Sequence, residues 1–399
     1  MTDLSARELV PRRIREIELP PFDPLNGRAA ELRAQGHHVV SLGQALPFFE
    51  PPAEAIAAAR EALLTAQVNA YSTDPGRPKL RAAFAERLSA TLGATISAGD
   101  ILITAGANHA FTLALTTLVG AGDEVILPAP YFTNHQMAIC ALGAVPVEAP
   151  VADRATFAVT WADIAPHVSS KTKAVVLCTP SNPTGALIDP HEGARIVREL
   201  APRGIVVFSD ETYMHFVYDD EHWSAASVAC WRENVVVIGT CSKSFGMMGW
   251  RVGFMLADAA ICTEAVKIQD AMIICAPTIS QMAAEPAVRD RWTYAVGFHD
   301  ELRLRRQLLA DGIRTTPRLS WTPTSGGLFG FVRVDGCEDS VALSHDLLER
   351  AHVVTIPGAA FGASGEGFLR ISYGAASVDD LRTAIARLQR YFAADITTV

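Results

Sequence analysis

The chain has 399 residues, of which 49% are hydrophobic and 19% are charged, and its net charge at pH 7 is −9. The apolar content excludes a disordered chain, which would combine few apolar residues with a high net charge. The negative charge argues against nucleic-acid binding, and because no run of about 18 apolar residues occurs, we expect no membrane span. With so few charges, we expect much surface to be buried in a large core and in a subunit interface.

The first half of the chain alternates between helical and strand-like patterns. The N-terminal segment up to residue 18 mixes arginines with glutamates, which favours a solvated helical face and, without a following apolar stretch, no secretory signal. Amphipathic helices are predicted over 53–66 and 79–92. Runs rich in Val and Ile follow, at 101–104, 124–127, 144–147, 174–178, 205–208 and 235–239. Such runs are typical of strands buried on both faces of a parallel sheet. Since helical stretches at 107–119 and 190–201 separate some of them, an α/β fold with right-handed crossovers is predicted.

After about residue 285 the character of the chain changes. The pattern predicts a charged helix, two strands and two further helices, in the ranges 298–311, 328–334, 368–373, 341–350 and 378–392. This composition indicates a smaller α+β lobe. We expect the N-terminal 40 residues to pack with it.

The cysteines and histidines give no sign of a metal site. The seven cysteines are scattered, odd in number and form no Cys-x-x-Cys pair, which is typical of free thiols in a reducing cytoplasm. His37–His38 is the one tight histidine pair, and neighbouring side chains point in different directions. No metal is therefore predicted.

Polar residues follow several of the predicted strands. Lys243 comes just after the last Val-rich run, where desolvation would lower the pKa of its amine and suit it to Schiff-base chemistry. A surface lysine in a loop is the plain alternative. Asp210 and Tyr213 follow the preceding run, and Asn182 follows the one before that. Because ligands of parallel sheets bind at the carboxyl ends of the strands, these residues predict one site.

A glycine-led helix start adds an anion site to this edge. The strand at 101–104 runs into Gly106, Ala107 and Asn108, where the backbone N–H groups of a helix N-terminus can hold an anion. Each element alone also fits an N-cap, a core tyrosine or an ordinary helix start. Together they predict a site for a phosphate-bearing cofactor whose carbonyl group a lysine captures.

Three segments carry a resemblance to a known family: SNPTG at 181–185, SDETY at 209–213 and SKSFGMMGWRVGF at 242–254. They resemble segments of the class I and II aminotransferases, which are pyridoxal-phosphate enzymes of fold type I in the aspartate aminotransferase superfamily. The resemblance begins at Gly43 and ends around Arg370, so it covers nearly the whole chain.

The resemblance implies a fold and two domains. The fold is α/β, with a three-layer α/β/α large domain around a mainly parallel seven-stranded sheet. This large domain, which binds the cofactor, would cover 46–286. The smaller α+β domain would combine 1–45 with 287–399.

The resemblance also implies roles for the residues at the strand ends. Lys243 would form an aldimine with the cofactor, pyridoxal 5′-phosphate, and move the proton between the substrate α-carbon and the cofactor. Asp210 would pair with the protonated ring nitrogen and so keep the ring an electron sink. Tyr213 and Asn182 would donate to the phenolate oxygen, and Phe132 would stack on the ring. The catalytic residues expected are Lys243, Asp210 and Tyr213.

The cofactor phosphate would be held from several sides. The helix start at Gly106, Ala107 and Asn108 would offer N–H groups, Thr240 a hydroxyl and Arg251 a guanidinium. Tyr71 resembles a tyrosine that reaches the phosphate in the neighbouring subunit. The resemblance therefore implies a homodimer with shared active sites.

The same resemblance points to the substrate. Arg370 would grip the α-carboxylate of an L-amino acid, with Asn182 and the backbone of Gly43 beside it, and a 2-oxo acid would be the second substrate. Phe48 and Phe49 stand where many relatives have small or acidic residues, so they either pack between the lobes or line an apolar pocket. Because no second arginine can be placed for an acidic side chain, a neutral or aromatic amino donor is favoured.

The motifs do not separate transamination from related reactions. A lyase or an enzyme of β/γ-elimination or replacement, including one acting on S-adenosylmethionine, would share Lys243, Asp210 and Arg370. We favour transamination in the cytoplasm. A DNA-binding regulator is disfavoured because only about 40 residues precede Gly43 and the net charge is negative.

Overall fold

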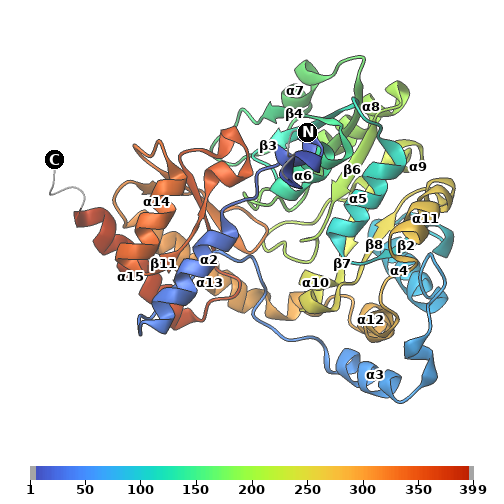
Figure 1. Ribbon diagram of the computed structural model, residues 1–399, viewed down its shortest axis with the longest axis horizontal. Helices are drawn as coiled ribbons and strands as arrows, with labels where there is room; N and C mark the ends of the chain where they lie inside the picture. Colours follow the sequence, from blue (N-terminus) through green and yellow to red (C-terminus); the bar gives the residue numbers. More distant parts are fainter. Residues whose placement is uncertain (1–5, 395–399) are drawn as a thin grey trace.

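The computed structural model describes residues 6–394. It has a larger half around a central sheet and a smaller half formed by the C-terminal part of the chain together with α2 (Figure 1). The central sheet has seven strands in the order β2-β8-β7-β6-β5-β3-β4. Within it β8 is antiparallel to both of its neighbours, and the other neighbouring strands pair in parallel. This confirms the predicted mainly parallel seven-stranded sheet. Its strands are β2 (Ile101–Thr104), β3 (Glu124–Ala129), β4 (Val145–Pro150), β5 (Thr172–Cys178), β6 (Val206–Asp210), β7 (Val235–Thr240) and β8 (Gly253–Leu256).

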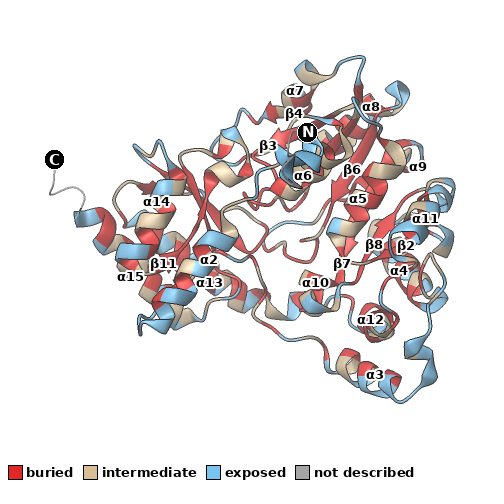
Figure 2. Ribbon diagram, viewed as in Figure 1, coloured by how far each residue is buried: buried red, intermediate tan, exposed pale blue. Residues whose placement is uncertain are grey.

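Helices cover both faces of this sheet. In β2, Ile101 and Ile103 belong to one core and Leu102 to another, because successive strand residues point to opposite faces. β2, β6 and β7 are buried along their whole length, which explains their continuous apolar runs, whereas the edge strand β4 is mostly half-buried (Figure 2). The first core includes residues of α3 (Ala53–Leu63), α4 (Pro78–Leu92), α7 (Trp161–Ile164), α8 (Pro190–Leu200), α9 (Trp231–Asn234) and α12 (Thr278–Asp290). The second includes residues of α5 (Ala107–Leu118), α6 (Thr133–Leu142) and α11 (Ala259–Ile273).

Sequence reasoning placed six of these strands and missed the location of β8. The strand has four residues and directly follows the glycine-rich segment, so it shows no separate apolar run. Its first residue, Gly253, lies so close to Gly106 that an added Cβ would stand 2.9 Å from the Gly106 Cα. Glycine at 253 thus allows the strand to pass beside the start of α5.

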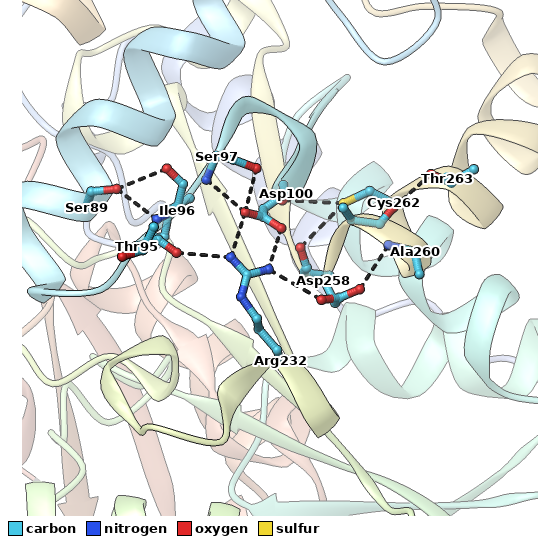
Figure 3. Close-up of polar contacts among 12 residues, drawn as sticks. Ser89, Thr95, Ile96, Ser97, Asp100, Arg232, Asp258, Ala260, Cys262 and Thr263 are labelled. Atoms are coloured by element: carbon cyan, nitrogen blue, oxygen red, sulfur yellow. Dashed lines mark hydrogen bonds and ion pairs between the residues drawn. The ribbon is translucent and has the colours of Figure 1, made fainter.

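An ion-pair network fastens one end of the sheet (Figure 3). Arg232 of α9 donates to both carboxylate oxygens of Asp100, over 2.6 and 2.9 Å. Its Nη1 also lies 3.3 Å from Asp258 Oδ2. Asp100 precedes β2 and Asp258 follows β8, so one guanidinium joins the ends of two neighbouring strands.

The smaller half contains a four-stranded antiparallel sheet in the order β12-β13-β10-β9. Its strands are β9 (Leu319–Ser320), β10 (Phe329–Val334), β12 (Ile356–Pro357) and β13 (Phe368–Ser372). Its helices are α13 (His299–Arg314), α14 (Ser340–Asp346), which continues as a π-helical turn over Leu347–Ala351, and α15 (Val378–Ala394). The predicted helices and strands of the smaller α+β lobe are all present.

Residues 22–41 of the N-terminal segment pack on this smaller half, as predicted, whereas Arg13 donates to the Ala141 carbonyl oxygen of α6 in the larger half. β1 (Val40–Ser41) pairs in parallel with β11 (Val353–Val354), and α2 (Phe22–Ala34) buries one face against the same region. The predicted charged helical face is reduced to α1 (Arg12–Arg15), a single exposed turn. The domain division at residues 45/46 and 286/287 stays a prediction, since the core of the smaller half also takes in Phe49.

No helix between residues 6 and 394 is long and apolar enough to cross a membrane. Within the same range there is no group of three or more His, Cys, Asp or Glu side chains arranged to hold a metal ion. All seven cysteines are free thiols.

Candidate active site

A cavity of about 430 Å³ opens at the carboxyl ends of β5, β6 and β7. These strands are neighbours, and the register pairs Cys178 with Asp210 at their ends. The helix α2 and the strands β12 and β13 of the smaller half close the cavity from the other side. Its lining includes these residues predicted from the sequence: Gly43, Ala107, Asn108, Phe132, Asn182, Asp210, Tyr213, Thr240, Lys243, Arg251 and Arg370.

Asp210 lies at the floor of the cavity, where it ends β6. Burial disfavours its charge, but a 3.0 Å hydrogen bond from His135 Nε2, the charge of His135 and the backbone N–H of Thr212 together hold the pKa of its carboxyl below the usual value. Asp210 is therefore a buried carboxylate that stays ionised. Such a group can keep a cationic ring nitrogen protonated.

Lys243 stands in the four-residue helix α10 (Cys241–Ser244), directly after β7. The Thr240 hydroxyl caps this turn by accepting the backbone N–H of Ser242 over 3.1 Å. Burial, and then the positive charges of Arg370 and Arg251, lower the pKa of the Lys243 amine to about 8. A substantial share of the amine is thus neutral near physiological pH and can act as a nucleophile or a base.

The anion-binding end of the cavity lies around Gly106 and Arg251. Gly106 has φ 87°, and an added Cβ would stand 2.4 Å from Arg251 Nη2, so the guanidinium packs directly on the glycine backbone. Arg251 Nη1 donates to the Met248 carbonyl oxygen over 3.0 Å. The N-terminus of the 12-residue helix α5 faces the same space through Ala107 and Asn108. Helix N–H groups and a guanidinium together suit a phosphate.

The opposite end of the cavity is formed by Arg370 of β13. Its Nη1 donates to Asn182 Oδ1 over 2.8 Å and its Nη2 donates to the Gly43 carbonyl oxygen over 2.7 Å. Its buried Nε has no hydrogen-bond partner among the described residues. Burial lowers the pKa of the guanidinium to about 10, so it stays charged at neutral pH. The ring of Phe361 lies 5.0 Å from its Cζ. A buried, fixed guanidinium of this kind suits a carboxylate ligand.

Two aromatic residues complete the wall. Burial raises the pKa of the Tyr213 hydroxyl well above its ordinary value, so the hydroxyl remains a hydrogen-bond donor. Phe132 lines the cavity and packs edge-on against His135, with ring centroids 5.4 Å apart. Tyr131 is buried against the backbone of Gly362 and does not line the cavity, which fits the sequence-based preference for Phe132.

Comparisons with known proteins agree with this geometry. Residues 37–388 match the family described as aminotransferase class I and II. The chain belongs to this family. It is 33% identical over 357 residues to an aspartate aminotransferase of Pyrococcus abyssi, covering 88% of this chain and 91% of that protein. It is 32% identical to aromatic-amino-acid aminotransferase 2 of Thermococcus litoralis, covering 90% and 92% of the two chains.

Solved structures show the same fold for this aminotransferase. The aspartate aminotransferase from Thermus thermophilus with maleate superposes with a TM-score of 0.90 at 28% identity and covers 96% of this chain and 99% of that one. The aromatic aminotransferase from Pyrococcus horikoshii OT3 gives a TM-score of 0.86 at 32% identity, with 93% and 99% covered. The predicted family, fold and enzyme class are confirmed.

The aminotransferases of this family depend on pyridoxal 5′-phosphate, and the cavity fits that cofactor. Lys243 offers an amine of lowered pKa, Asp210 a buried carboxylate for the ring nitrogen, and Arg251 a guanidinium for the phosphate. The close approach of Gly106 to Arg251 leaves no space for a side chain where the phosphate end is formed. The donor set therefore matches an aldehyde, a pyridine ring and a phosphate in one ligand.

Sequence reasoning missed several lining residues of the aminotransferase. It also missed His135, which bonds to Asp210 but does not line the cavity; His135 follows Phe132 by three residues, a spacing that by itself does not single it out. Ser242 and Cys178 are neighbours of predicted residues, and Phe22, Asp23 and Asn26 belong to α2, which no motif connected with the cavity. An aspartate or asparagine beside an aromatic residue at a helix start gives no signal of a binding site.

Two other predictions have different outcomes. Tyr71 does not line the cavity of its own chain, and its side chain is 76% exposed. Phe48 and Phe49 pack rather than line the cavity: Phe49 stacks on Phe298 with centroids 4.2 Å apart, and Arg305 lies over the ring of Phe48 at 4.0 Å. The packing interpretation of these two phenylalanines is therefore confirmed.

Proposed function

We propose that this aminotransferase moves the amino group of a neutral or aromatic L-amino acid to a 2-oxo acid, with Lys243 as the group that carries the proton. The observation that carries the proposal is the placement of four charged groups in one cavity. The charges of Arg251, at the anion-binding end, and of Arg370, at the opposite end, both act on Lys243, and Asp210 lines the same cavity. A phosphate and an α-carboxylate can then be bound near one amine.

Pyridoxal 5′-phosphate, when bound, supplies an aldehyde that reacts with amines and a ring that takes up the electrons of a carbanion at the substrate α-carbon. The protein supplies position and charge. Arg251 and the start of α5 would bind the phosphate, Phe132 would cover one ring face, and Tyr213 would donate to the phenolate oxygen. Asp210, held ionised by His135, would keep the ring nitrogen protonated.

The proton is moved by Lys243 Nζ. Because the pKa of this amine is about 8, it can accept a proton from the substrate α-carbon and then release it on the cofactor side, without a large energetic penalty for either transfer. Arg370 fixes the substrate through its carboxylate, so that the α-carbon is oriented toward the lysine. Asn182 and Gly43 already hold this guanidinium, and a carboxylate adds charge-assisted bonds to it.

The charges of the cavity support a neutral or aromatic side chain on the substrate. Among the described residues of the lining, the cations are Lys243, Arg251 and Arg370, and each already has a role. No further cation of the lining is left for a second carboxylate. Apolar side chains, including Phe22 and Ile356, form part of the wall. The Thermococcus litoralis relative is named for aromatic amino acids, which agrees with this preference.

A half-reaction screen tests the proposal. The loaded enzyme is mixed with single amino acids, and the conversion of the cofactor to its amine form is followed by absorbance. We expect faster conversion with phenylalanine, tyrosine, leucine or alanine than with aspartate at equal concentration. Preference for aspartate would contradict the substrate class. Release of ammonia or of a sulfur leaving group without conversion would instead favour a lyase or elimination reaction, and S-adenosylmethionine is included for that reason.

We further propose that the enzyme is a cytoplasmic homodimer in which Tyr71 completes the phosphate site of the neighbouring subunit. The exposed Tyr71 ring supports this, as do the exposed apolar residues Leu63 and Leu64 before it and Met272 near the end of α11. Light scattering of the purified protein measures the mass. A monomer that binds the cofactor and transaminates at full rate would overturn the shared site.

A further inference from the structure

The loop from residue 70 to residue 77 carries Tyr71 and is fixed against the central sheet. Gly76 has φ 100°, and an added Cβ there would stand 2.4 Å from Ile103 of β2. The Ile103 backbone N–H donates to the Pro75 carbonyl oxygen over 3.0 Å, and the Thr73 hydroxyl closes the turn by donating to Gly76 over 2.7 Å. The loop therefore contacts β2 at Ile103, three residues before Gly106 at the anion-binding end of its own chain.

Gln281 of α12 holds both ends of this loop. Its Oε1 accepts the backbone N–H of Arg77 over 2.8 Å, and its Nε2 donates to Ser72 Oγ over 2.9 Å. The same Nε2 donates to the Ala276 carbonyl oxygen over 2.7 Å. The Gln281 side chain is fully buried, and it does not line the cavity. Its polar atoms thus form hydrogen bonds to the loop and to the turn before α12.

Two further buried side chains act on the same loop. The Thr278 hydroxyl donates to the Ala70 carbonyl oxygen over 2.9 Å, and the Gln269 amide of α11 donates to the Asp74 carbonyl oxygen. The residues on either side of Tyr71 are therefore both tied to α12, Ala70 through Thr278 and Ser72 through Gln281. The side chain between them remains 76% exposed.

We propose that Gln281 is a positioning residue that holds Tyr71 in place for the cofactor of the neighbouring subunit. A buried amide is tolerated when its polar atoms are hydrogen-bonded, and those of Gln281 bond mainly to this loop. Here they fix the loop that carries the exposed Tyr71 side chain. The inference rests on the proposed shared active site. It predicts that loss of Gln281 damages the partner's cofactor site and spares the site of its own chain.

Hybrid dimers of the full-length enzyme separate these two effects. The two chains carry different affinity tags, and Lys243→Ala inactivates one site so that a single site remains. In the first dimer, Gln281→Met is placed on the Lys243→Ala chain, which lends its loop to the working site. In the second dimer, Gln281→Met is placed on the chain with the working lysine. Both dimers contain the same substitutions, so general effects on folding are equal.

We expect the working site of the first dimer to bind pyridoxal 5′-phosphate about tenfold more weakly than that of the second. The substitution removes the hydrogen bonds that position Tyr71, and Tyr71 would make one of the contacts to the cofactor. Cofactor affinity is read from the visible absorbance of the lysine-bound form, and kcat and KM are recorded beside it. Equal affinities in the two dimers would overturn the positioning role.

Control variants keep the inference separate from the shared site. Tyr71→Phe, placed in the same two ways, reports whether the tyrosine acts across subunits. If Tyr71→Phe is asymmetric and Gln281→Met is not, the positioning role fails and the shared site stands; if Tyr71→Phe is symmetric, both fail. Asn234→Leu removes another buried amide, which donates to the carbonyl oxygens of Val197 and Ile205. It should change the cofactor affinity of the working site equally in both dimers.

A milder variant serves if Gln281→Met does not fold. Thr278→Val removes the bond to Ala70 at almost constant volume, and it should give the same asymmetry with a change of about threefold. Symmetric behaviour of Thr278→Val would overturn the anchoring of the loop by α12.

Discussion

His135 Nε2 lies 3.0 Å from Asp210 Oδ2, and both side chains are buried under the cavity. The histidine belongs to α6, whose N-cap is Phe132, so the start of one short helix carries both the partner of Asp210 and an aromatic side chain of the cavity wall. The pair accounts for a buried carboxylate whose pKa is lowered although burial opposes its charge.

Replacing this histidine tests that relationship. In His135→Leu, Asp210 loses its side-chain partner, and the pKa of its carboxyl should rise toward or above the ordinary value. We expect cofactor affinity and kcat/KM to fall by about 10- to 100-fold, since a hydrogen bond to a charged group contributes about 1.5–3 kcal/mol. Titration of cofactor binding against pH measures the shift. His135→Gln, which keeps an N–H donor, should restore most of the loss, and an equal loss in both variants would contradict the assignment.

The proposed carboxylate-binding role of Arg370 predicts an effect on substrate affinity. Arg370→Ala should raise KM for the amino acid by about 100-fold or more while cofactor affinity stays close to that of the wild type, because a buried charge pair with the substrate is lost. Steady-state kinetics and cofactor titration are run side by side. Arg333→Ala, an exposed arginine on the neighbouring strand β10, is the matched control and should change neither value. An equal loss of affinity for the cofactor and for the substrate would contradict the placement of Arg370 in the substrate site.

The lowered pKa of Lys243 predicts the pH dependence of loading. The neutral amine is the reactive form, and its pKa of about 8 replaces an ordinary value of 10.5. The second-order rate of cofactor uptake by the cofactor-free protein should therefore rise as pH increases through about 8 and level off above it. Stopped-flow absorbance measures this rate. A rate that continues to rise to pH 10 would mean that the amine is not perturbed.

The Arg232 network predicts an effect on stability. Burial disfavours the charge of Asp100, but hydrogen bonds from Arg232 and Ser97 outweigh it and lower the pKa of the carboxyl. A lowered carboxyl pKa stabilises the fold above the ordinary aspartate value, and this stabilisation is lost as pH falls through the folded-state pKa. Asp100→Asn should thus lower the free energy of unfolding by about 1–2 kcal/mol at pH 7, a value kept small because Arg232 is partly exposed. Below about pH 3.5 the loss should be smaller.

Thermal unfolding at pH 7 and at pH 3.5 checks this prediction. The matched control is Asp379→Asn, which removes an exposed carboxylate paired with Arg382 and should leave the unfolding temperature within about one degree at both pH values. A loss of stability in Asp100→Asn that is the same at both pH values would point to packing and not to charge.

The predictable part of the site follows from parallel strands. Asn182, Asp210 and Lys243 come after three Val-rich runs, and neighbouring parallel strands bring their carboxyl ends to one edge. Local pattern alone thus places three polar side chains together. The family resemblance then adds Arg251 and Arg370, whose positions depend on the return of the chain through β8 and on the smaller sheet.

Other contacts could not be predicted because they depend on long-range packing. The bond between Arg370 and Asn182 joins residues 188 positions apart, and the Gly43 carbonyl reaches the same guanidinium from the N-terminal segment. His135 is one of several residues in the first turns of α6, and only the packing of that helix decides which side chain faces Asp210. Tyr71 shows a further limit, since the space it is expected to enter belongs to a second chain.

The guanidinium of Arg370 is the meeting point of three separate stretches of chain. It stands on β13 of the smaller half, touches Asn182 beside the central sheet and touches Gly43 after β1. A relative shift of any of these stretches changes the orientation of its N–H groups, while the phosphate end at Gly106 and Arg251 is built within the larger half. Substitutions far from the cavity, at the contacts between the two halves, should therefore alter the affinity for amino acids and leave the affinity for the cofactor unchanged.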